Sequence, residues 1–233
     1  MKIAVIIPVY NERKAIHQVL KKIPSCVKFI ISVDDASTDD TRKYISEFKS
    51  SSMCDSRYHF LSLKENKGVG GATVYGFYYA IKLGANILVK MDGDGQMLPD
   101  YLPSLIKPIL EGKSDLMKGN RLYSFSSMKN MPKIRLFGNL LLSILTAIPM
   151  KSLQGIDPQN GYIAISASFF KKLNTSSLNS RFAFENSLLI EANRKKGIIG
   201  NLPIPSFYGN ESSHISISKF IIDFCLFLLR ELV

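Results

Sequence analysis

Short apolar runs alternate with amphipathic stretches through the first part of the chain. The runs have the length and composition of strands, and the stretches between them have helical periodicity. Strands alternating with helices indicate an α/β fold with a mostly parallel sheet covered on both faces. Ligands of such sheets bind beyond the carboxyl ends of the strands. The predicted strands are Ile3–Ile7, Val27–Val33, Tyr58–Leu63 and Asn86–Met91, and the predicted helices are Ala15–Ile23, Thr41–Phe48 and Val69–Leu83.

The second part of the chain is less regular. One apolar stretch, Ile134–Ile148, carries its hydrophobic residues at helical spacing. It is either a core helix or an amphipathic helix on a membrane surface, and the pattern alone does not separate the two. The other predicted helices are Leu102–Leu110 and Phe184–Arg194, the predicted strands are Asp115–Lys118, Tyr162–Ile165 and Ile198–Ile204, and Pro205–Ser213 is a predicted loop.

The C-terminal stretch Ile215–Val233 is apolar but interrupted by charged residues. It is too short and too polar to indicate a membrane-spanning helix. It can pack on the domain, lie in a membrane interface or begin a membrane segment. We find no internal repeat, low-complexity stretch or linker. The sequence therefore predicts a single domain over residues 1–213, followed by an apolar C-terminal helix over residues 214–233 that can associate with a membrane.

Composition narrows the class of partner. The 233 residues are 46% hydrophobic and 21% charged, as in a folded domain with one core. The formal net charge of +11 favours an anionic partner such as a phosphorylated substrate or an acidic membrane surface. No recognition helix, zinc pattern or aromatic RNA-binding motif is present, so we expect no nucleic acid. The sparse, odd number of cysteines, three, fits a reducing cytosol.

Polar or glycine-rich segments follow all four of the first predicted strands. Asp34 and Asp35 come after the second, and a carboxylate there can bind a base or a ribose. Gly68, Gly70 and Gly71 open a predicted helix, where backbone N–H groups can approach a phosphate. Because the strands are predicted to be parallel, all four segments are expected at one rim of the sheet.

The segment after the fourth strand, Asp92-Gly93-Asp94, brings two carboxylates to that rim. Carboxylate oxygens suit a hard divalent cation, Mg²⁺ or Mn²⁺, which commonly links one or two acidic side chains to the phosphates of a substrate. Such an ion neutralises charge that develops on a departing diphosphate. An ordinary strand-to-helix turn has the same residue types. The combination of four polar segments favours the metal site.

In this order, the segments Pro8-Val9-Tyr10-Asn11-Glu12, Asp34-Asp35-Ala36-Ser37-Thr38-Asp39, Asn66-Lys67-Gly68 and Asp92-Gly93-Asp94 resemble the family 2 glycosyltransferases. The resemblance implies a GT-A (Rossmann-like) fold and inverting transfer from a nucleotide-diphospho-sugar, UDP- or GDP-linked. It implies a metal held by Asp92 and Asp94. It also implies a nucleotide-sugar site formed by Pro8, Tyr10, Glu12, Asp35, Asn66, Lys67, Gly71, Asp92 and Gly93.

Within that family the sequence is most similar to polyprenyl-phosphate (dolichyl-phosphate mannose synthase-like) enzymes and to bacterial surface-polysaccharide transferases. The supporting segments are Met91–Gln96, Lys118–Arg121, Arg135 and Asp157–Tyr162. The resemblance implies catalytic roles for Asp94, Glu185 and Arg121. The acceptor-binding residues expected from it are Arg121, Arg135, Gln159 and Asn160.

The sequence departs from the family pattern at the position of the general base. Many members carry a Glu-Asp pair there, whereas this chain has Glu185-Asn186. A hydroxyl acceptor needs a base, and an amide cannot take a proton. A phosphate acceptor is already anionic and requires cations, such as Arg121 and Arg135, more than deprotonation. The leading hypothesis is therefore transfer to polyprenyl phosphate at the cytoplasmic face of a membrane. The alternatives are transfer to a sugar hydroxyl of a lipid-linked or surface polysaccharide, and a nucleotide-binding scaffold without activity.

Overall fold

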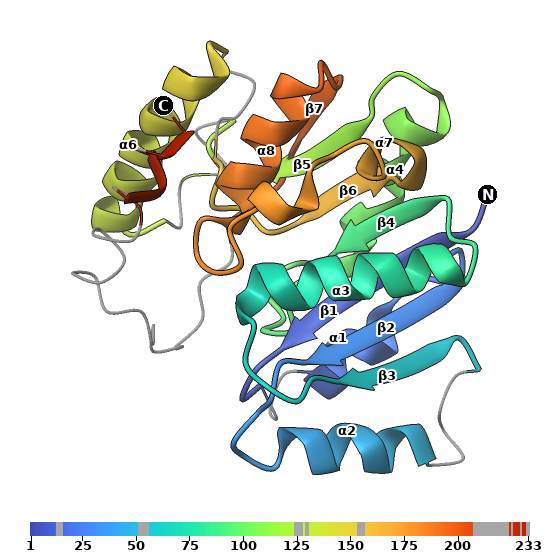
Figure 1. Cartoon of the computed structure of the whole chain (residues 1–233). Coiled ribbons are helices and arrows are strands. Elements are labelled where there is room, and N and C mark those ends of the chain that lie inside the picture. Colours follow the sequence, from blue (N-terminus) through green and yellow to red (C-terminus); the bar gives the residue numbers. More distant parts are fainter. Residues whose placement is uncertain are drawn as a thin grey trace.

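The chain forms an α/β fold around one seven-stranded sheet, in a computed structural model (Figure 1). The structure describes residues 1–12, 16–50, 56–123, 128, 131–152, 157–206, 224, 226–228 and 230–231. The strands are β1 (Ile3–Val9), β2 (Phe29–Asp34), β3 (Tyr58–Ser62), β4 (Ile87–Lys90), β5 (Leu116–Asn120), β6 (Ile163–Ser166) and β7 (Ile199–Pro203). Their order across the sheet is β3-β2-β1-β4-β6-β5-β7.

The sheet is mostly parallel, as the alternating pattern predicts. β1 pairs in parallel with β2 and β4, β2 with β3, and β5 with β7. Only β6 runs antiparallel to its neighbours β4 and β5. The strand itself was predicted at Tyr162–Ile165, but its direction was not. A short apolar run carries no information on direction, which depends on the connections before and after it.

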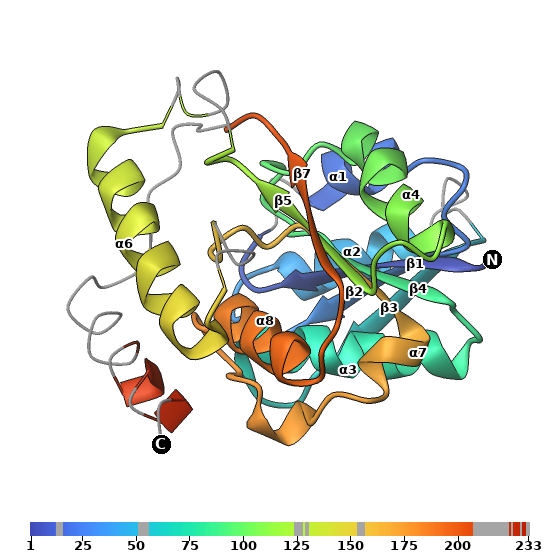
Figure 2. The same ribbon diagram turned by 90° about the horizontal axis from the view of Figure 1, so that it is seen from above.

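Helices cover both faces of the sheet (Figure 2). On one face, α1 (Ile16–Lys22), α2 (Thr41–Ser50) and α4 (Leu102–Leu110) pack on a core that includes Ile45 and Leu105. On the other face, α3 (Gly68–Lys82), α7 (Ala167–Phe170) and α8 (Phe184–Arg194) pack on a core that includes Phe77 and Phe184. The two cores explain why the central strands are apolar throughout: every residue of β1 and β4 is buried.

Helix α6 (Lys133–Met150) contacts α8 and has most of its surface exposed (Figure 1). Its buried residues are Ser143, Thr146 and Met150, whereas large apolar side chains on the helix are exposed. Leu142, Leu145 and Met150 pack on the core, so α6 is a core helix on one side only and exposes apolar side chains on the other. The exposed apolar side chains are Ile134, Phe137, Leu140, Leu141, Ile144 and Ile148.

Element boundaries agree closely with the sequence pattern. α4 and α8 have the predicted bounds, and α6 begins one residue earlier and ends two residues later than predicted. Three short elements were not predicted as such: the 3-10 helices η1 (Pro99–Tyr101) and η3 (Thr175–Ser177), and α7. Within the predicted C-terminal helix, residues 224, 226–228 and 230–231 are helical. The proposed boundary at residue 214 and the loop from residue 207 onward lie outside the described residues.

Candidate active site

The carboxyl ends of the first four strands meet at one rim, as predicted from their order. In the parallel register Val9 lies beside Asp34, Asp34 beside Ser62, and Ile6 beside Lys90. The loops that follow these strands consequently converge. Asn11, after β1, accepts a hydrogen bond from the Thr38 N–H group of the next loop at 2.9 Å. The rim is thus held together by contacts between loops.

Asp34 and Asp35 are both buried at this rim but have different surroundings. Asp34 Oδ2 accepts hydrogen bonds from Arg42 Nε at 2.8 Å and from Ser62 Oγ at 3.1 Å. Burial alone would raise the pKa of Asp34, but hydrogen bonds from Ser37, Arg42 and Ser62 outweigh it, so the pKa is lowered. Asp34 therefore stabilises the β2 end of the rim as a carboxylate.

The Asp35 carboxylate lies at the beginning of α3. Its Oδ1 atom accepts the Lys67 N–H at 2.7 Å, and Asn66 Nδ2 donates to the Asp35 carbonyl at 3.2 Å. Burial raises the pKa of Asp35 more than the hydrogen bonds from Lys67 and Gly68 and the charge of Arg181 lower it. Asn66 and Lys67, both predicted to contact the nucleotide sugar, thus hold Asp35 in place through these groups.

The glycines at the start of α3 contact the loop before α8. The N–H groups of Gly70 and Gly71 both donate to the Ser180 carbonyl, at 2.8 and 3.2 Å. A side chain at Gly70 would collide with the Asn179 carbonyl and with Phe184. These glycines therefore allow α3 to approach the loop before α8 closely, and the contact of Gly71 with the nucleotide sugar stays a prediction.

The remaining predicted nucleotide contacts lie on the first and fourth loops. Tyr10 is exposed, with 45% of its surface accessible, and Glu12 is half-buried. Pro8 is buried in β1, beside Val33 of β2, and positions this loop. Gly93 is buried next to Ile7, Ile16 and the Pro8 carbonyl, which places the Asp92–Asp94 turn directly beside the β1 loop.

Asp92 and Asp94 both reach the rim. Asp94 is half-buried, and its Oδ1 atom accepts the Gln96 N–H at 2.9 Å, which shapes the turn. Asp92 has a side chain that is 31% exposed, and its Oδ1 atom lies 2.5 Å from Lys90 Nζ. The same ammonium lies 2.9 Å from Glu185 Oε1. Strand β4 and helix α8 are therefore joined by a buried lysine beneath the turn.

Lys90 is a charged group in this setting. Burial alone would lower its pKa, but the charges of Asp92 and Glu185 and the hydrogen bonds to them outweigh burial, so the pKa of Lys90 is raised. Glu185 is 7% exposed and lies in the first turn of α8. The side chain predicted as a possible base is thus an almost buried partner of an ammonium group.

Asn186, at the position where the family pattern has an acid, is completely buried. Its Nδ2 atom donates to Thr146 Oγ1 of α6 at 2.8 Å, and its Oδ1 atom accepts from Gln159 Nε2 at 2.7 Å. Gln159, predicted to bind the acceptor, therefore holds Asn186. The Asn160 Oδ1 atom accepts the Tyr162 N–H, and the residue is 3% exposed. Its contact with an acceptor stays a prediction.

Arg121 forms a bidentate ion pair with Asp157. Its Nε atom lies 2.9 Å from Oδ2 and its Nη2 atom 2.8 Å from Oδ1 of a carboxylate with no exposed surface. Arg121 was predicted to bind a phosphate, and one edge of its guanidinium binds Asp157 here. Arg135 is exposed in the first turn of α6. Both arginines remain predicted acceptor-binding residues.

Lys118 of β5 is a second fully buried lysine, and its Nζ atom donates to the Asp157 carbonyl at 2.5 Å. Burial lowers the pKa of Lys118 from 10.5 to about 8, although the charge of Asp157 opposes this. Between these two values the unfolded chain binds more protons than the folded chain. The free energy of unfolding must therefore rise with pH across this window, and this contribution is constant below it.

We expect the wild type to become more stable relative to Lys118→Met as the pH rises from about 7.5 to about 9.5. The unfolding free energy of the wild type minus that of the variant should therefore increase. Urea denaturation of both proteins at each pH measures it. Comparing the two proteins cancels the titration of the other groups. A difference that does not change with pH would contradict the burial of a neutralisable ammonium at this position.

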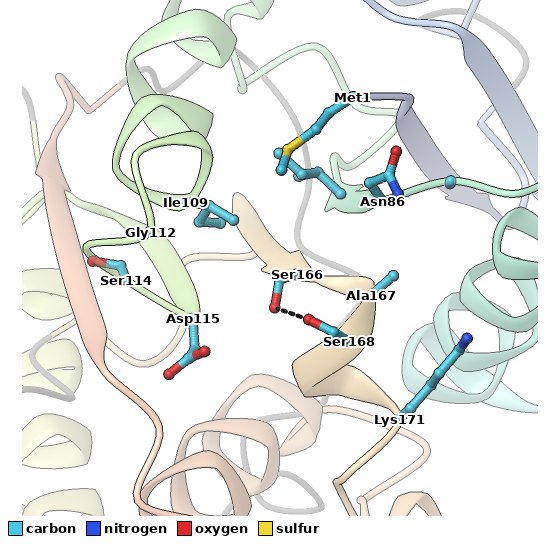
Figure 3. A pocket seen from close by; sticks show the side chains of 12 residues that line it. Met1, Asn86, Ile109, Gly112, Ser114, Asp115, Ser166, Ala167, Ser168 and Lys171 are labelled. Atoms are coloured by element: carbon cyan, nitrogen blue, oxygen red, sulfur yellow. Dashed lines mark hydrogen bonds between the residues drawn. The ribbon is translucent and has the colours of Figure 1, made fainter.

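Two pockets among the described residues lie away from the acid pair. The first, of about 390 Å³, is at the opposite end of the sheet and is lined by Asn86, Asp115, Ser166 and Lys171 among others (Figure 3). None of the predicted site residues lines it. The second, of about 520 Å³, lies between the loop before α8 and the C-terminal helical residues. Its lining includes two arginines and four large apolar side chains, namely Arg181, Phe182, Phe224, Leu226, Phe227 and Arg230.

A family model described as glycosyl transferase family 2 matches residues 4–174. The chain belongs to glycosyl transferase family 2. The resemblance seen in the sequence, and the expectation of an enzyme, are confirmed. The matched region includes all the strands from β1 to β6 and therefore the whole rim with Asp35, Asp92 and Asp94.

This family 2 glycosyltransferase is similar over nearly its whole length to proteins named for lipid-phosphate acceptors. It is 34% identical over 216 residues to a UDP-N-acetylglucosamine–dolichyl-phosphate N-acetylglucosaminyltransferase of Methanococcus voltae, covering 88% of this chain and 86% of that protein. It is 28% identical over 207 residues to an undecaprenyl-phosphate mannosyltransferase of Micrococcus luteus, covering 88% and 83%.

The solved structures confirm the GT-A fold. Glucosyl-3-phosphoglycerate synthase from Mycobacterium tuberculosis, crystallised with Mn²⁺, uridine diphosphate and phosphoglyceric acid, superposes with a TM-score of 0.71 at 21% identity. The superposition covers 99% of this chain and 78% of that one. At this identity the likeness establishes the fold of the family 2 glycosyltransferase and not its substrates.

A divalent cation fits the acids of this glycosyltransferase. Among the described residues, no three or more His, Cys, Asp or Glu side chains form a group that could hold a metal by themselves. Asp92 and Asp94, however, present hard oxygen ligands at the rim, and both are partly exposed. Mg²⁺ and Mn²⁺ are commonly held by one or two carboxylates together with substrate phosphates. The residues present suit an ion that arrives with a diphosphate.

Two basic residues in this glycosyltransferase received no role from the sequence. Lys90 ends the apolar run Ile87–Lys90, directly before Met91 and Asp92, and a lysine inside a buried strand is a signal for an internal ion pair. Arg181 lies in the loop whose Ser180 carbonyl holds α3, and its charge acts on Asp35. No local pattern marks Arg181, because its neighbours come from distant parts of the chain.

Proposed function

We propose that the chain is an inverting, metal-dependent glycosyltransferase that moves a sugar from a nucleotide-diphospho-sugar to a polyprenyl phosphate. The observation that carries the choice of acceptor is the state of Glu185. Its carboxylate is almost buried and accepts a hydrogen bond from Lys90, and the neighbouring Asn186 is an amide held by Thr146 and Gln159. Neither side chain is placed to take a proton from an acceptor hydroxyl. An acceptor that is already ionised needs no such base.

The donor is proposed to lie along the rim. Asp35 and the exposed Tyr10 hold the nucleotide, and Asp92 and Asp94 hold the metal. When bound, Mg²⁺ or Mn²⁺ supplies positive charge to the departing diphosphate. The phosphate oxygen of the acceptor attacks the anomeric carbon from the opposite face, the bond to the diphosphate breaks, and the configuration inverts. The named relatives that use dolichyl and undecaprenyl phosphate support this acceptor class.

Helix α6 supports attachment to a membrane. Exposed large apolar residues form a stripe on this helix, and contiguous exposed apolar surface of this kind marks interaction sites. The sequence of α6 contains no acidic residue, while Lys133, Arg135 and Lys151 at its two ends are exposed. Basic ends beside an apolar face are typical of helices that lie on anionic membranes. We propose that the enzyme works at the inner face of the cell membrane, where its lipid acceptor resides.

α6 is proposed to lie on the membrane, not across it. By length and composition it is the one described helix that could cross a bilayer, with a mean hydropathy of 1.3. Its other side, however, is bound to the domain. Ser143 Oγ accepts the Asp157 N–H at 3.1 Å, and Thr146 Oγ1 accepts from Asn186. Crossing the bilayer would break both contacts and expose the buried Asn186 amide.

We expect Ile144→Glu to lower partitioning onto vesicles containing anionic phosphatidylglycerol by at least about tenfold, because one large apolar side chain is lost from the interface. Ile144 is 61% exposed, so the fold does not depend on it. Co-sedimentation with vesicles measures the partitioning. Tyr75→Glu, at a 47% exposed site on α3, is the matched control and is expected to bind as the wild type does. Equal binding of all three proteins would contradict the proposed membrane surface.

The proposed function is tested by incubating the protein and Mn²⁺ with radiolabelled UDP- and GDP-sugars and undecaprenyl phosphate in detergent. A thermal-shift screen first identifies the donor, because ligand binding raises stability by mass action. We expect label in the lipid fraction, with a glycosyl phosphate of inverted configuration. Transfer only to sugar hydroxyls, with none to the lipid phosphate, would overturn the proposed acceptor.

A further inference from the structure

Lys90 is a fully enclosed charged group at the candidate active site. Its side chain is 1% exposed, and its Nζ atom contacts Asp92 Oδ1 at 2.5 Å, Glu185 Oε1 at 2.9 Å and the Gly161 carbonyl at 3.5 Å. The three partners come from the turn after β4, from α8 and from the segment before β6. One ammonium group therefore connects three parts of the chain directly beneath the rim.

The surroundings of this ammonium fix Asp92 as well. Gly161 packs so closely that a side chain there would collide with both Lys90 Nζ and Asp92 Oδ2. The Asp92 N–H also lies 3.3 Å from Met97 Sδ, so the backbone at the turn is held from a further side. Asp92 thus has one oxygen bound to Lys90 and the other against Gly161. Its carboxylate has a defined orientation before any ligand arrives.

Burying the ion pair of Lys90 and Glu185 costs free energy that an apolar residue at this position of β4 would not. Removing an ammonium and a carboxylate from water is unfavourable, and apolar side chains of similar size are often equally stable. The preceding residues of β4, Ile87, Leu88 and Val89, show the ordinary solution. Within the cluster, the Lys90 and Glu185 side chains are 1% and 9% exposed, while Asp92 is 31% exposed. Asp92 is therefore the one carboxylate of this cluster that reaches the site, and the buried Lys90 and Glu185 lie behind it.

We propose that Lys90 is a positioning residue that orients the Asp92 carboxylate for the metal and diphosphate of the donor, and that Glu185 holds Lys90 in place without acting on the acceptor. The inference rests on the proposed function, because it takes Asp92 as a ligand of the donor complex. Groups held in the productive geometry before binding lose less freedom when the ligand arrives. Lys90 then affects the donor side, although it contacts neither metal nor sugar.

The test compares two variants that leave no buried charge unpaired. Glu185→Gln keeps the contact between Lys90 and Asp92, whereas Lys90→Met combined with Glu185→Gln removes it. Mn²⁺ affinity is measured by electron paramagnetic resonance in the presence of whichever of UDP and GDP stabilises the wild type more. We expect the double variant to bind Mn²⁺ about tenfold or more weakly, as when a partner of a metal ligand is lost, and to show a higher KM for the donor. We expect Glu185→Gln, whose amide oxygen can still accept a hydrogen bond from Lys90, to weaken Mn²⁺ binding less than the double variant does and to lower kcat by less than about tenfold.

A matched control removes the other buried lysine. Lys118 lies on β5, and its ammonium donates to the Asp157 carbonyl, so Lys118→Met should leave Mn²⁺ affinity close to that of the wild type. Circular dichroism confirms that each variant is folded. Equal Mn²⁺ affinity in the wild type and the double variant would overturn the positioning role of Lys90.

Two further outcomes separate this inference from the proposed function. A loss of kcat of about a hundredfold in Glu185→Gln, with Mn²⁺ affinity intact, would identify Glu185 as a base and overturn its role as a holder of Lys90. If the wild type binds no Mn²⁺ in the presence of either UDP or GDP, the proposed metal-dependent function is wrong, and the inference is wrong with it. Normal binding by the wild type together with unchanged binding by the double variant overturns the inference alone.

Discussion

Asp94→Asn is expected to lower kcat/KM for sugar transfer by at least about a hundredfold, the range seen when a group that stabilises charge in a transition state is removed. The substitution takes away one negative charge from the proposed metal site. It keeps the shape of the turn, because an amide oxygen can still accept the Gln96 N–H that Asp94 Oδ1 accepts at 2.9 Å. Steady-state transfer of labelled sugar, with thermal unfolding as a check on folding, measures the effect.

Asp100→Asn is the matched control for this prediction. Asp100 is an exposed acid in η1, a short way along the chain from the turn. Asp100→Asn removes the same charge as Asp94→Asn. We expect its activity to remain close to that of the wild type. If Asp94→Asn retains full transfer at saturating Mn²⁺, then Asp94 does not hold the metal and the proposed donor site is wrong.

Arg121→Ala is expected to lower the free energy of unfolding by about 3 kcal/mol. The Asp157 carboxylate has no exposed surface, and Arg121 supplies two side-chain hydrogen bonds to it. Removing the guanidinium leaves a buried charge uncompensated, which is more costly than losing an exposed ion pair. Urea denaturation gives the difference, provided that unfolding is two-state.

The double variant Arg121→Ala with Asp157→Asn provides the control. Because it removes the uncompensated charge, it should regain part of the lost stability, and the two substitutions should not be additive. Lys113→Ala, which breaks an exposed ion pair with Glu111, should change stability little. If Arg121→Ala is as stable as the wild type but fails to bind undecaprenyl phosphate, then Arg121 serves the acceptor and contributes nothing to the fold.

The sequence predicted the first half of the sheet almost completely. Buried parallel strands are apolar and alternate with helices, so the apolar runs indicate the positions of the strands and the helices between them indicate their parallel direction. β6 shows where this reasoning ends. Its apolar run marked a strand, but its antiparallel pairing with β4 and β5 depends on the connections before and after it.

The candidate site was predicted in the same uneven way. Asp92 and Asp94 are recognisable because they follow a strand within a few residues, and Asp35 because it does the same. The sequence did not show what the glycines at the start of α3 contact. Glycine allows a phosphate or another backbone to approach, and only the position of Ser180 shows that the neighbour is the protein itself.

For α6 the sequence left two interpretations open. A helix with apolar residues at regular spacing reads the same whether that face points to the core or to solvent. The hydrogen bonds of Ser143 and Thr146, together with the packing of Leu142, Leu145 and Met150 on the core, show which side of α6 faces the domain. The exposed apolar stripe follows from that orientation, and the membrane proposal depends on it.

By itself the sequence determined the α/β architecture, the family and the acids at the rim, because each of these follows from patterns of residues that are close together along the chain. The tertiary structure decided what those acids touch. Lys90 meets Glu185, and Arg121 meets Asp157, across large separations in sequence, where no periodicity or spacing connects them. Such pairs form only when distant segments pack, and packing is a property of the whole folded chain.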